Sequence, residues 1–109
     1  MLEEAKAIKN AIRETLSREG IEKVRVIIFG SRARGDFQKS SDWDLLVLID
    51  TELSPSKRKE IWNILYGNLH NLFPHYSFDI LIKNSTAFEE EKLVVNTIAH
   101  EAYLEGIEV

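Results

Sequence analysis

Cysteine is absent from this chain of 109 residues. Disulfide bonds and thiolate metal sites are therefore excluded, and any metal ion must be held by oxygen atoms or by imidazole. The three histidines, His70, His75 and His100, lack the spacing of a zinc-binding pair on a helix. Hard cations with oxygen ligands are the metals that this composition favours.

Long hydrophobic runs are also missing. The longest apolar stretches, Val24 to Phe29 and Leu45 to Ile49, are too short to cross a bilayer. The first residues, Met1-Leu2-Glu3-Glu4, are acidic where a secretory signal would be basic. We therefore expect no membrane segment and a cytoplasmic protein.

Basic residues are outnumbered by acidic ones: the chain has 14 Lys and Arg residues against 18 Asp and Glu residues, and its net charge is −4. A general nucleic-acid binder needs a basic field to displace counterions from phosphate, so we do not expect that class here. The local pattern around one Gly-Ser segment differs and favours a small anionic ligand. The basic residues there are Lys23, Arg25, Arg32, Arg34 and Lys39.

Hydrophobic residues make up 44% of the chain and charged residues 29%, which is typical of a globular domain. We find no repeat, low-complexity stretch or linker. One domain over residues 1–109 is therefore expected.

Residue periodicity predicts helices and strands in the order α-β-α-β-α-β-α. Apolar residues three or four apart over 2–16, followed by Gly20, predict a helix. Residues 24–29 and 44–49 predict strands, with a short helix after Gly30. Ser54-Pro55 predicts the cap of a helix that ends before Pro74. The apolar stripe of the first helix comprises Leu2, Ala5, Ile8, Ile12 and Leu16.

The last third of the chain predicts a strand and a helix. Residues 76–82 predict a strand in which Asp79 stands out among apolar neighbours. Thr86 and Glu89 have the spacing of a capping box, which predicts the start of a single final helix. Its inward side chains are expected to be Phe88, Leu93, Val94, Ile98 and Ala102.

The connections between strands predict their arrangement. The short connection between residues 29 and 44 predicts an antiparallel pair, and the helical crossover to residue 76 predicts a parallel pair. The predicted fold class is α/β in the broad sense, more narrowly α+β, with a mixed sheet of three to four strands flanked by helices. One edge of this sheet then holds the end of the first strand and the beginnings of the other two.

Three aspartates are expected at this edge. Asp42 and Asp44 are two residues apart, so both point to one face while Trp43 points to the other. Asp79 lies near the beginning of the third strand and meets them there. Clustered carboxylates raise one another's pKa unless a cation neutralises them, so the arrangement predicts a divalent metal ion, Mg²⁺.

Gly30 and Ser31 predict a phosphate site beside these acids. A glycine allows the backbone conformation and close approach that a phosphate needs, and the next amides and the Ser31 hydroxyl can donate to its oxygens. A Gly-Ser pair alone indicates only a turn. Together with the acids it predicts a metal-nucleotide site. Arg32 and Arg34 are further candidate nucleotide-binding residues, in which case Arg32 would face phosphate and Arg34 would also brace the helix against nearby acids.

These motifs resemble the signature of the DNA polymerase β-like nucleotidyltransferase superfamily, and more narrowly the minimal nucleotidyltransferases, over nearly the whole chain. The motifs are Gly30-Ser31-Arg32-Ala33-Arg34-Gly35, Ser41-Asp42-Trp43-Asp44-Leu45 and Phe78-Asp79-Ile80. The resemblance implies transfer of a nucleoside monophosphate, AMP from ATP, to an acceptor hydroxyl, with release of diphosphate.

The resemblance also implies roles for individual residues. Asp42 and Asp44 would bind two Mg²⁺ ions, and Asp79 would complete the metal site nearest the acceptor and help to activate its hydroxyl. Gly30 and Ser31 would hold the terminal phosphates.

The acceptor is implied by the resemblance and not by any residue. In the minimal class it is commonly a separate helical protein of the HEPN type, and such pairs resemble toxin and antitoxin. This chain would then be an antitoxin that adenylylates a tyrosine of its partner, in a homo- or hetero-oligomer. Two alternatives stay open: a nucleotidyltransferase for a small molecule such as an aminoglycoside, and a nucleotide-binding module that neutralises its partner by binding alone.

Overall fold

The structure is a computed structural model that describes residues 2–109, with the side chain of Leu2 outside the described part. Helices and strands alternate along the first two thirds of the chain, as the periodicity predicts. Two helices and a very short strand then end it. In chain order the elements are α1 (Leu2–Arg18), β1 (Val24–Phe29), α2 (Ser31–Arg34), β2 (Trp43–Ile49), α3 (Pro55–Leu72), β3 (Phe78–Asn84), α4 (Ser85–Glu91), α5 (Ile98–Glu105) and β4 (Ile107–Glu108).

The sheet has four strands in the order β3-β2-β1-β4. β2 is antiparallel to β1 and parallel to β3, which confirms the predicted pairing and the mixed α+β fold class. β4 adds a short antiparallel pairing to the free side of β1. The end of β1 and the beginnings of β2 and β3 therefore lie at one edge, as predicted.

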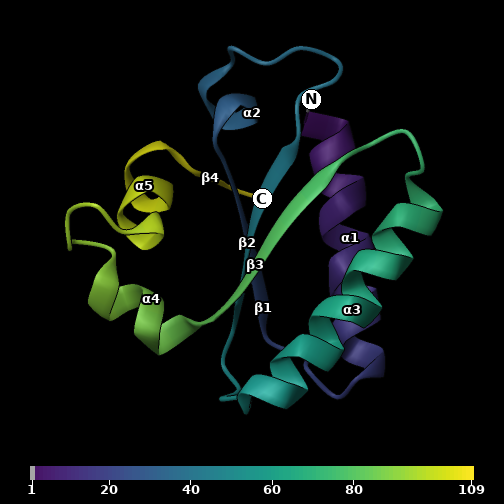
Figure 1. Ribbon diagram of the computed structural model, residues 1–109, viewed down its shortest axis with the longest axis vertical. Helices are drawn as coiled ribbons and strands as arrows, with labels where there is room; N and C mark the ends of the chain where they lie inside the picture. The colour runs from purple at the N-terminus through teal and green to yellow at the C-terminus, as the bar shows by residue number, and fades with distance from the viewer. Residues whose placement is uncertain (1) are drawn as a thin grey trace.

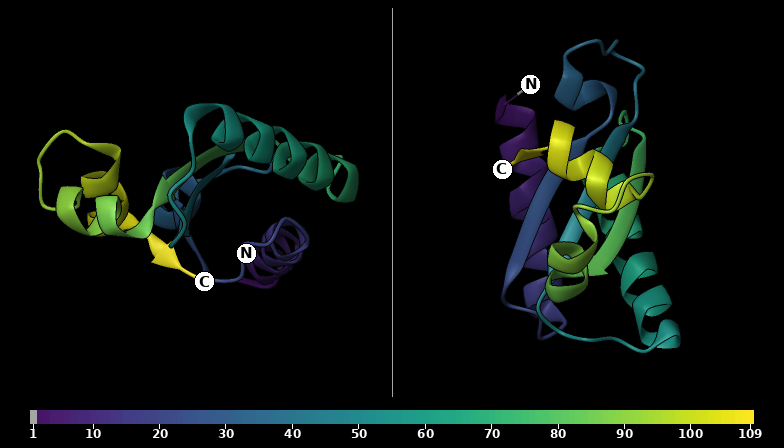
Figure 2. Two further views of the ribbon diagram at one scale, coloured as in Figure 1. Left: turned by 90° about the horizontal axis from the view of Figure 1, so that it is seen from below. Right: turned by 90° about the vertical axis from the view of Figure 1, so that its left-hand side faces the viewer.

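The helices cover the sheet from two sides. Figures 1 and 2 show α1 and α3 on one face and α4 and α5 on the other. The α1–α3 side holds the larger core, in which Ile8, Ile12 and Leu65 are fully buried. Each such side chain contributes about 1.5–3 kcal/mol to folding. The α4–α5 side is covered by three buried residues of these helices, Phe88, Ala99 and Ala102.

The predicted ends of the first long helices agree with the structure. Gly20 has φ 81° and follows the end of α1. The Ser54 hydroxyl accepts a hydrogen bond from the Lys57 amide (3.2 Å) at the start of α3. Phe73 packs against the core, whereas Leu72 is 61% exposed. Within residues 2–109, no helix combines the length and apolar character that a membrane span needs.

The single final helix is a wrong prediction. The chain breaks at residues 92–97, where Asn96 adopts φ 68° and Thr97 caps α5 by accepting a hydrogen bond from the His100 amide. α4 also begins earlier than predicted, because the Asn84 side chain accepts from the amides of Thr86 and Ala87. Phe88 and Ala102 are buried as expected, but three of the residues predicted to face inward are exposed: Leu93, Val94 and Ile98.

Candidate active site

A cleft of about 500 Å³ opens at the sheet edge where β1 ends and β2 and β3 begin. It contains all three aspartates that the sequence singles out, together with the Gly-Ser segment. The cleft lies on the α5 side of the sheet. Its lining residues are Phe29, Gly30, Ser31, Arg34, Ser41, Asp42, Asp44, Asp79, Leu81, Ile98 and Glu101.

Strand register brings the acids together. Asp44 on β2 is aligned with Asp79 on the parallel strand β3, and neighbouring strands are about 4.8 Å apart. On its other side Asp44 is opposite Phe29, the last residue of β1. One carboxylate therefore lies between the second acid and the Gly30-Ser31 turn.

Alternation along β2 separates the polar side chains from the core. Asp42 precedes the strand and is exposed, Asp44 is half-buried, and Trp43 between them is fully buried. Trp43 belongs to the core on the α1–α3 side. Because the indole is anchored beneath the sheet, both flanking carboxylates are directed toward the cleft, as the spacing predicts.

Only glycine fits at position 30 in this arrangement. Its backbone has φ 71° and ψ −153°, a region that is essentially restricted to glycine. A Cβ atom built on Gly30 would also collide with the Asp44 carboxylate. α2 begins at Ser31, so the first amides of this helix lie directly beside the acids.

The electrostatics of the cleft shift the pKa of Asp44. Burial raises the pKa of its carboxyl above the ordinary value. The negative charges of Asp79, Asp42 and Glu101 raise it further, while the Arg34 guanidinium acts in the opposite direction. The charged form of Asp44 is thus less favourable here than in water, which is the situation that a bound cation would reverse.

Oxygen donors of the kind that Mg²⁺ prefers are present, but they are not already gathered into a metal site. Among the described residues, no three acidic or histidine side chains are arranged to hold a metal ion. Asp42, Asp44 and Asp79 share the cleft. A divalent cation would draw their carboxylates together by side-chain rotation, and their donor chemistry fits such an ion.

Arg34 lies in the cleft and is engaged by acids. Its guanidinium forms ion pairs with Glu105 (3.2 Å) and Asp36 (3.5 Å). The pair with Glu105 holds α2 against α5 and joins two residues that are 71 positions apart in the chain. The predicted bracing of α2 against nearby acids agrees with this geometry.

The structure places Arg32 outside the cleft. The side chain is 6% exposed, and its guanidinium lies 4.7 Å from the ring centroid of Phe37 and 4.5 Å from that of Trp43. It donates to the carbonyl oxygens of Lys39 (3.3 Å) and Ser41 (3.0 Å). Arg32 therefore organises the loop that leads to Asp42, and we leave it out of the phosphate site.

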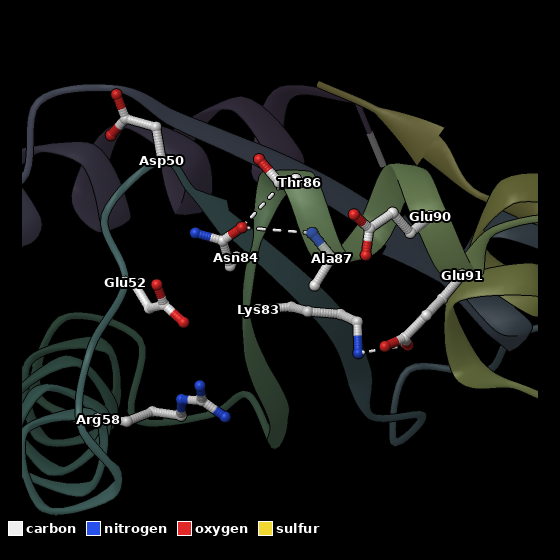
Figure 3. Close-up of a pocket in the computed structure, with 9 residues that line it drawn as sticks. All are labelled: Asp50, Glu52, Arg58, Lys83, Asn84, Thr86, Ala87, Glu90 and Glu91. Carbon is white, nitrogen blue, oxygen red and sulfur yellow. Dashed lines mark hydrogen bonds and ion pairs between the residues drawn. The ribbon is translucent and has the colours of Figure 1, made fainter.

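A larger cleft of about 610 Å³ lies at the opposite ends of β2 and β3 (Figure 3). Its charges are of both signs and are partly used within the protein: Lys83 pairs with Glu91 (2.7 Å). Asn84 points to the start of α4, where its side chain caps the helix. This cleft contains none of the residues of the sequence motifs, so its size alone does not make it the site.

Sequence reasoning missed Glu101 and Ile98 as residues of the site. Both belong to α5 and line the cleft beside the aspartates. The prediction of one continuous final helix placed Ile98 in the core and gave Glu101 no role. The sequence signal for the turn before α5 is the Asn96-Thr97 pair, because asparagine tolerates a positive φ and threonine is a common helix N-cap.

The fold and the site together define a class of protein, in which a mixed sheet carries paired acids beside a Gly-Ser turn at one edge. Residues 10–104 match a known protein family, described as "Polymerase beta, Nucleotidyltransferase". The chain therefore belongs to the polymerase beta nucleotidyltransferase family. A comparison with curated proteins gave no match.

Proposed function

We propose that this chain, as one minimal nucleotidyltransferase domain over residues 1–109, transfers AMP from ATP to an acceptor hydroxyl in the cytoplasm. The observation that supports this most directly is the position of Asp44. It is aligned with Asp79 on one side and faces the end of β1, next to Gly30, on the other. Carboxylates for metal ions and amides for phosphate thus meet in one cleft.

The roles follow from the chemistry of each group. Asp42 and Asp44 would hold two Mg²⁺ ions, and Asp79 would bind the ion nearest the acceptor. Such ions neutralise the departing diphosphate and lower the pKa of the attacking hydroxyl. Gly30 and Ser31 would hold the terminal phosphates through backbone amides and the Ser31 hydroxyl.

In the transfer step the acceptor oxygen forms a bond to the α-phosphorus, and the bond from that phosphorus to diphosphate breaks. The acceptor hydroxyl loses its proton, and Asp79 helps to remove it. Arg34, which lines the same cleft, contributes positive charge toward the phosphates. No covalent intermediate on the protein is required.

The acceptor that we propose is a tyrosine hydroxyl of a HEPN-type helical protein, with this chain as the antitoxin of the pair. The resemblance to minimal nucleotidyltransferases supports this choice. The cleft lies at an edge of the sheet, where a separate macromolecule can approach it.

The test is an assay of purified protein with Mg²⁺ and ATP labelled at the α-phosphate, in which diphosphate release and the labelled product are both measured. Asp44→Asn should lower the rate by about a hundredfold or more, because one carboxylate of the site is lost. Asp50→Asn is the matched control, since Asp50 is exposed and directly follows the far end of the same strand. An Asp44→Asn variant with the wild-type rate would refute catalysis at this site.

The identity of the labelled product separates the possible acceptors. Label on a tyrosine of a helical partner protein supports the protein adenylyltransferase. Label on a small alcohol such as an aminoglycoside would instead identify a small-molecule enzyme. Partner neutralisation that survives Asp44→Asn unchanged would identify a binding module.

A further inference from the structure

The connection between α4 and α5, together with the outer side of α5, exposes large apolar side chains to water. Three of them are consecutive, at positions 93–95. Exposed apolar residues that gather in one place mark interaction sites more often than isolated ones do. We call this surface the apolar rim; its residues, with their exposed fractions, are Leu93 67%, Val94 51%, Val95 66%, Ile98 49% and Leu104 65%.

Hydrogen bonds hold the connection in a defined shape. The Thr97 hydroxyl donates to the Val94 carbonyl (2.8 Å) and accepts from the His100 amide (3.0 Å). The Nδ1 atom of His100 lies 2.8 Å from the Lys92 carbonyl oxygen. A loop that is fixed before binding loses little conformational entropy when a partner docks. The apolar rim is therefore preorganised for binding a partner.

The apolar rim is continuous with the catalytic cleft. Ile98 and Glu101 line that cleft and also a neighbouring groove of about 420 Å³ that includes Val95. Leu104 is one helical turn from Glu101 on α5. Figure 1 shows the connection on the outer side of α5, on the opposite side of the sheet from α1 and α3. A protein seated on the rim would thus reach the mouth of the cleft.

Charge distinguishes between two possible occupants. Glu101 and Glu105 border the groove, and the whole chain has a net charge of −4. Glu105 is paired with Arg34, so Glu101 is the carboxylate that matters most here. A second copy docked through the same surface would bring Glu101 toward its own counterpart, which is unfavourable. A partner with lysines or arginines around an apolar centre would be complementary in both respects.

We infer that the apolar rim docks the acceptor protein, and that this protein presents an apolar contact surface bordered by basic residues. The inference rests on the proposed function and adds the surface through which the acceptor is recognised. Docking at the rim brings the acceptor hydroxyl to the side of the cleft where Ile98 and Glu101 lie. Recognition of the acceptor and the chemistry of transfer then use adjoining surfaces that share Ile98.

The experiment compares wild type with the double variant Val95→Glu/Leu104→Glu. Each protein is incubated with protein extract of the source cells, Mg²⁺ and ATP labelled at the α-phosphate. The label transferred to protein is expected to fall about tenfold or more, because two apolar contacts become charged. The Kd of the purified chain for ATP with Mg²⁺ should stay within about twofold, because neither residue lines the catalytic cleft.

Leu72→Glu is the matched control, since Leu72 is 61% exposed at the end of α3. It should leave both the label transfer and the ATP affinity unchanged. A second double variant, Leu93→Ser/Val94→Ser, tests the rim independently if the first one folds poorly. It should lose transfer in the same way.

The remaining outcomes overturn the inference in distinguishable ways. Undiminished transfer by both double variants would refute the docking surface and leave the proposed function intact. Label on nucleic acid or on a small molecule would refute a protein as the acceptor. A homodimer that Val95→Glu/Leu104→Glu dissociates identifies a second copy as the occupant. If wild type gives no transfer that depends on Asp44, the proposed function itself fails and this inference fails with it.

Discussion

Gly30 shows how one residue can serve both the backbone and the site. Its positive φ and the nearby Asp44 carboxylate each exclude a side chain. Gly20 has a similar φ of 81°, but no atom lies within 4 Å of the place where its Cβ would be. These two glycines therefore separate the effect of backbone strain from the effect of crowding in the cleft.

We expect Gly30→Ala to abolish most of the nucleotidyl transfer and Gly20→Ala to leave it intact. Both substitutions should lower the free energy of unfolding by about 1–2 kcal/mol, because alanine is strained at a positive φ. Gly30→Ala should cost more than Gly20→Ala, since the Asp44 carboxylate must also move. Transfer rates and denaturant unfolding measure the two effects. Full activity in Gly30→Ala would show that the close approach to Asp44 is not needed.

The charged Asp44 carboxylate is expected to destabilise the folded chain when no metal ion is bound. Burial and the neighbouring acids raise its pKa, so at neutral pH the charged carboxylate is less favourable in the folded chain than in the unfolded chain. Asp44→Asn removes that charge. In buffer with a metal chelator at neutral pH, it should raise the Tm by a few degrees.

Thermal unfolding followed by circular dichroism measures this change, with Asp50→Asn as a variant that should leave the Tm unchanged. As the pH falls below the raised pKa the difference between the proteins should shrink, and it should disappear below the ordinary pKa of an aspartate, where the carboxyl is protonated in both the folded and the unfolded chain. A lower Tm for Asp44→Asn at neutral pH would contradict the electrostatic argument.

Arg32 and Arg34 look equivalent in the sequence, yet their surroundings differ. Arg32 is buried between two rings and donates to two carbonyl oxygens, whereas the side chain of Arg34 is 42% exposed. Arg32→Ala should therefore lower the free energy of unfolding by about 2–4 kcal/mol. Arg34→Ala should lower it by less than about 1 kcal/mol. Urea unfolding of both variants gives the comparison, and equal losses would contradict the assigned environments.

At the scale of secondary-structure elements, the sequence predicts most accurately those elements whose burial follows a regular period. β1 has the predicted bounds, and Ser54 caps α3 as expected. The cleft aspartates could also be predicted, because strand alternation and chain connections determine where they meet. The side-chain environment of Arg32 could not, since it depends on the path of the loop between α2 and β2.

The break between α4 and α5 was hidden by a misleading pattern. Leu93, Val94 and Ile98 have the spacing of a buried helical stripe, and residues 92–97 contain neither glycine nor proline. The chain turns there through Asn96 in a left-handed conformation and through hydrogen bonds of Thr97. The periodicity of apolar residues does not indicate such local hydrogen bonds between side chain and backbone.

Thr97 should therefore determine the shape of this connection. Thr97→Val removes the hydroxyl that caps α5 and donates to the Val94 and Glu91 carbonyls. We expect a loss of about 1–2 kcal/mol in the free energy of unfolding. Limited proteolysis at residues 92–97 should also become faster. Thr86→Val, at an exposed position of α4, is the control, and equal proteolysis of both variants would contradict this role.

At the scale of the whole molecule, the two faces of the sheet are unequally covered. The α1–α3 side buries large residues such as Ile8, Ile12, Ile61 and Leu65. The α4 and α5 helices bury one phenylalanine and two alanines. Because local stability follows the apolar area buried, α4 and α5 should open more easily than the other helices. The helix that borders the cleft is thus also one of the least firmly attached.

Amide hydrogen exchange measures this difference along the chain. Without ligand, α5 should exchange through local unfolding, well before α1, α3 and the β1–β2 pair. Addition of ATP with Mg²⁺ should slow exchange in α2 and α5, because Ser31, Arg34 and Glu101 line the cleft, and should leave α3 unchanged. The Asp44→Asn variant should show the same ligand-free pattern but lose the protection by ATP. If α5 exchanged as slowly as α1, the thin α4–α5 layer would be as stable as the main core.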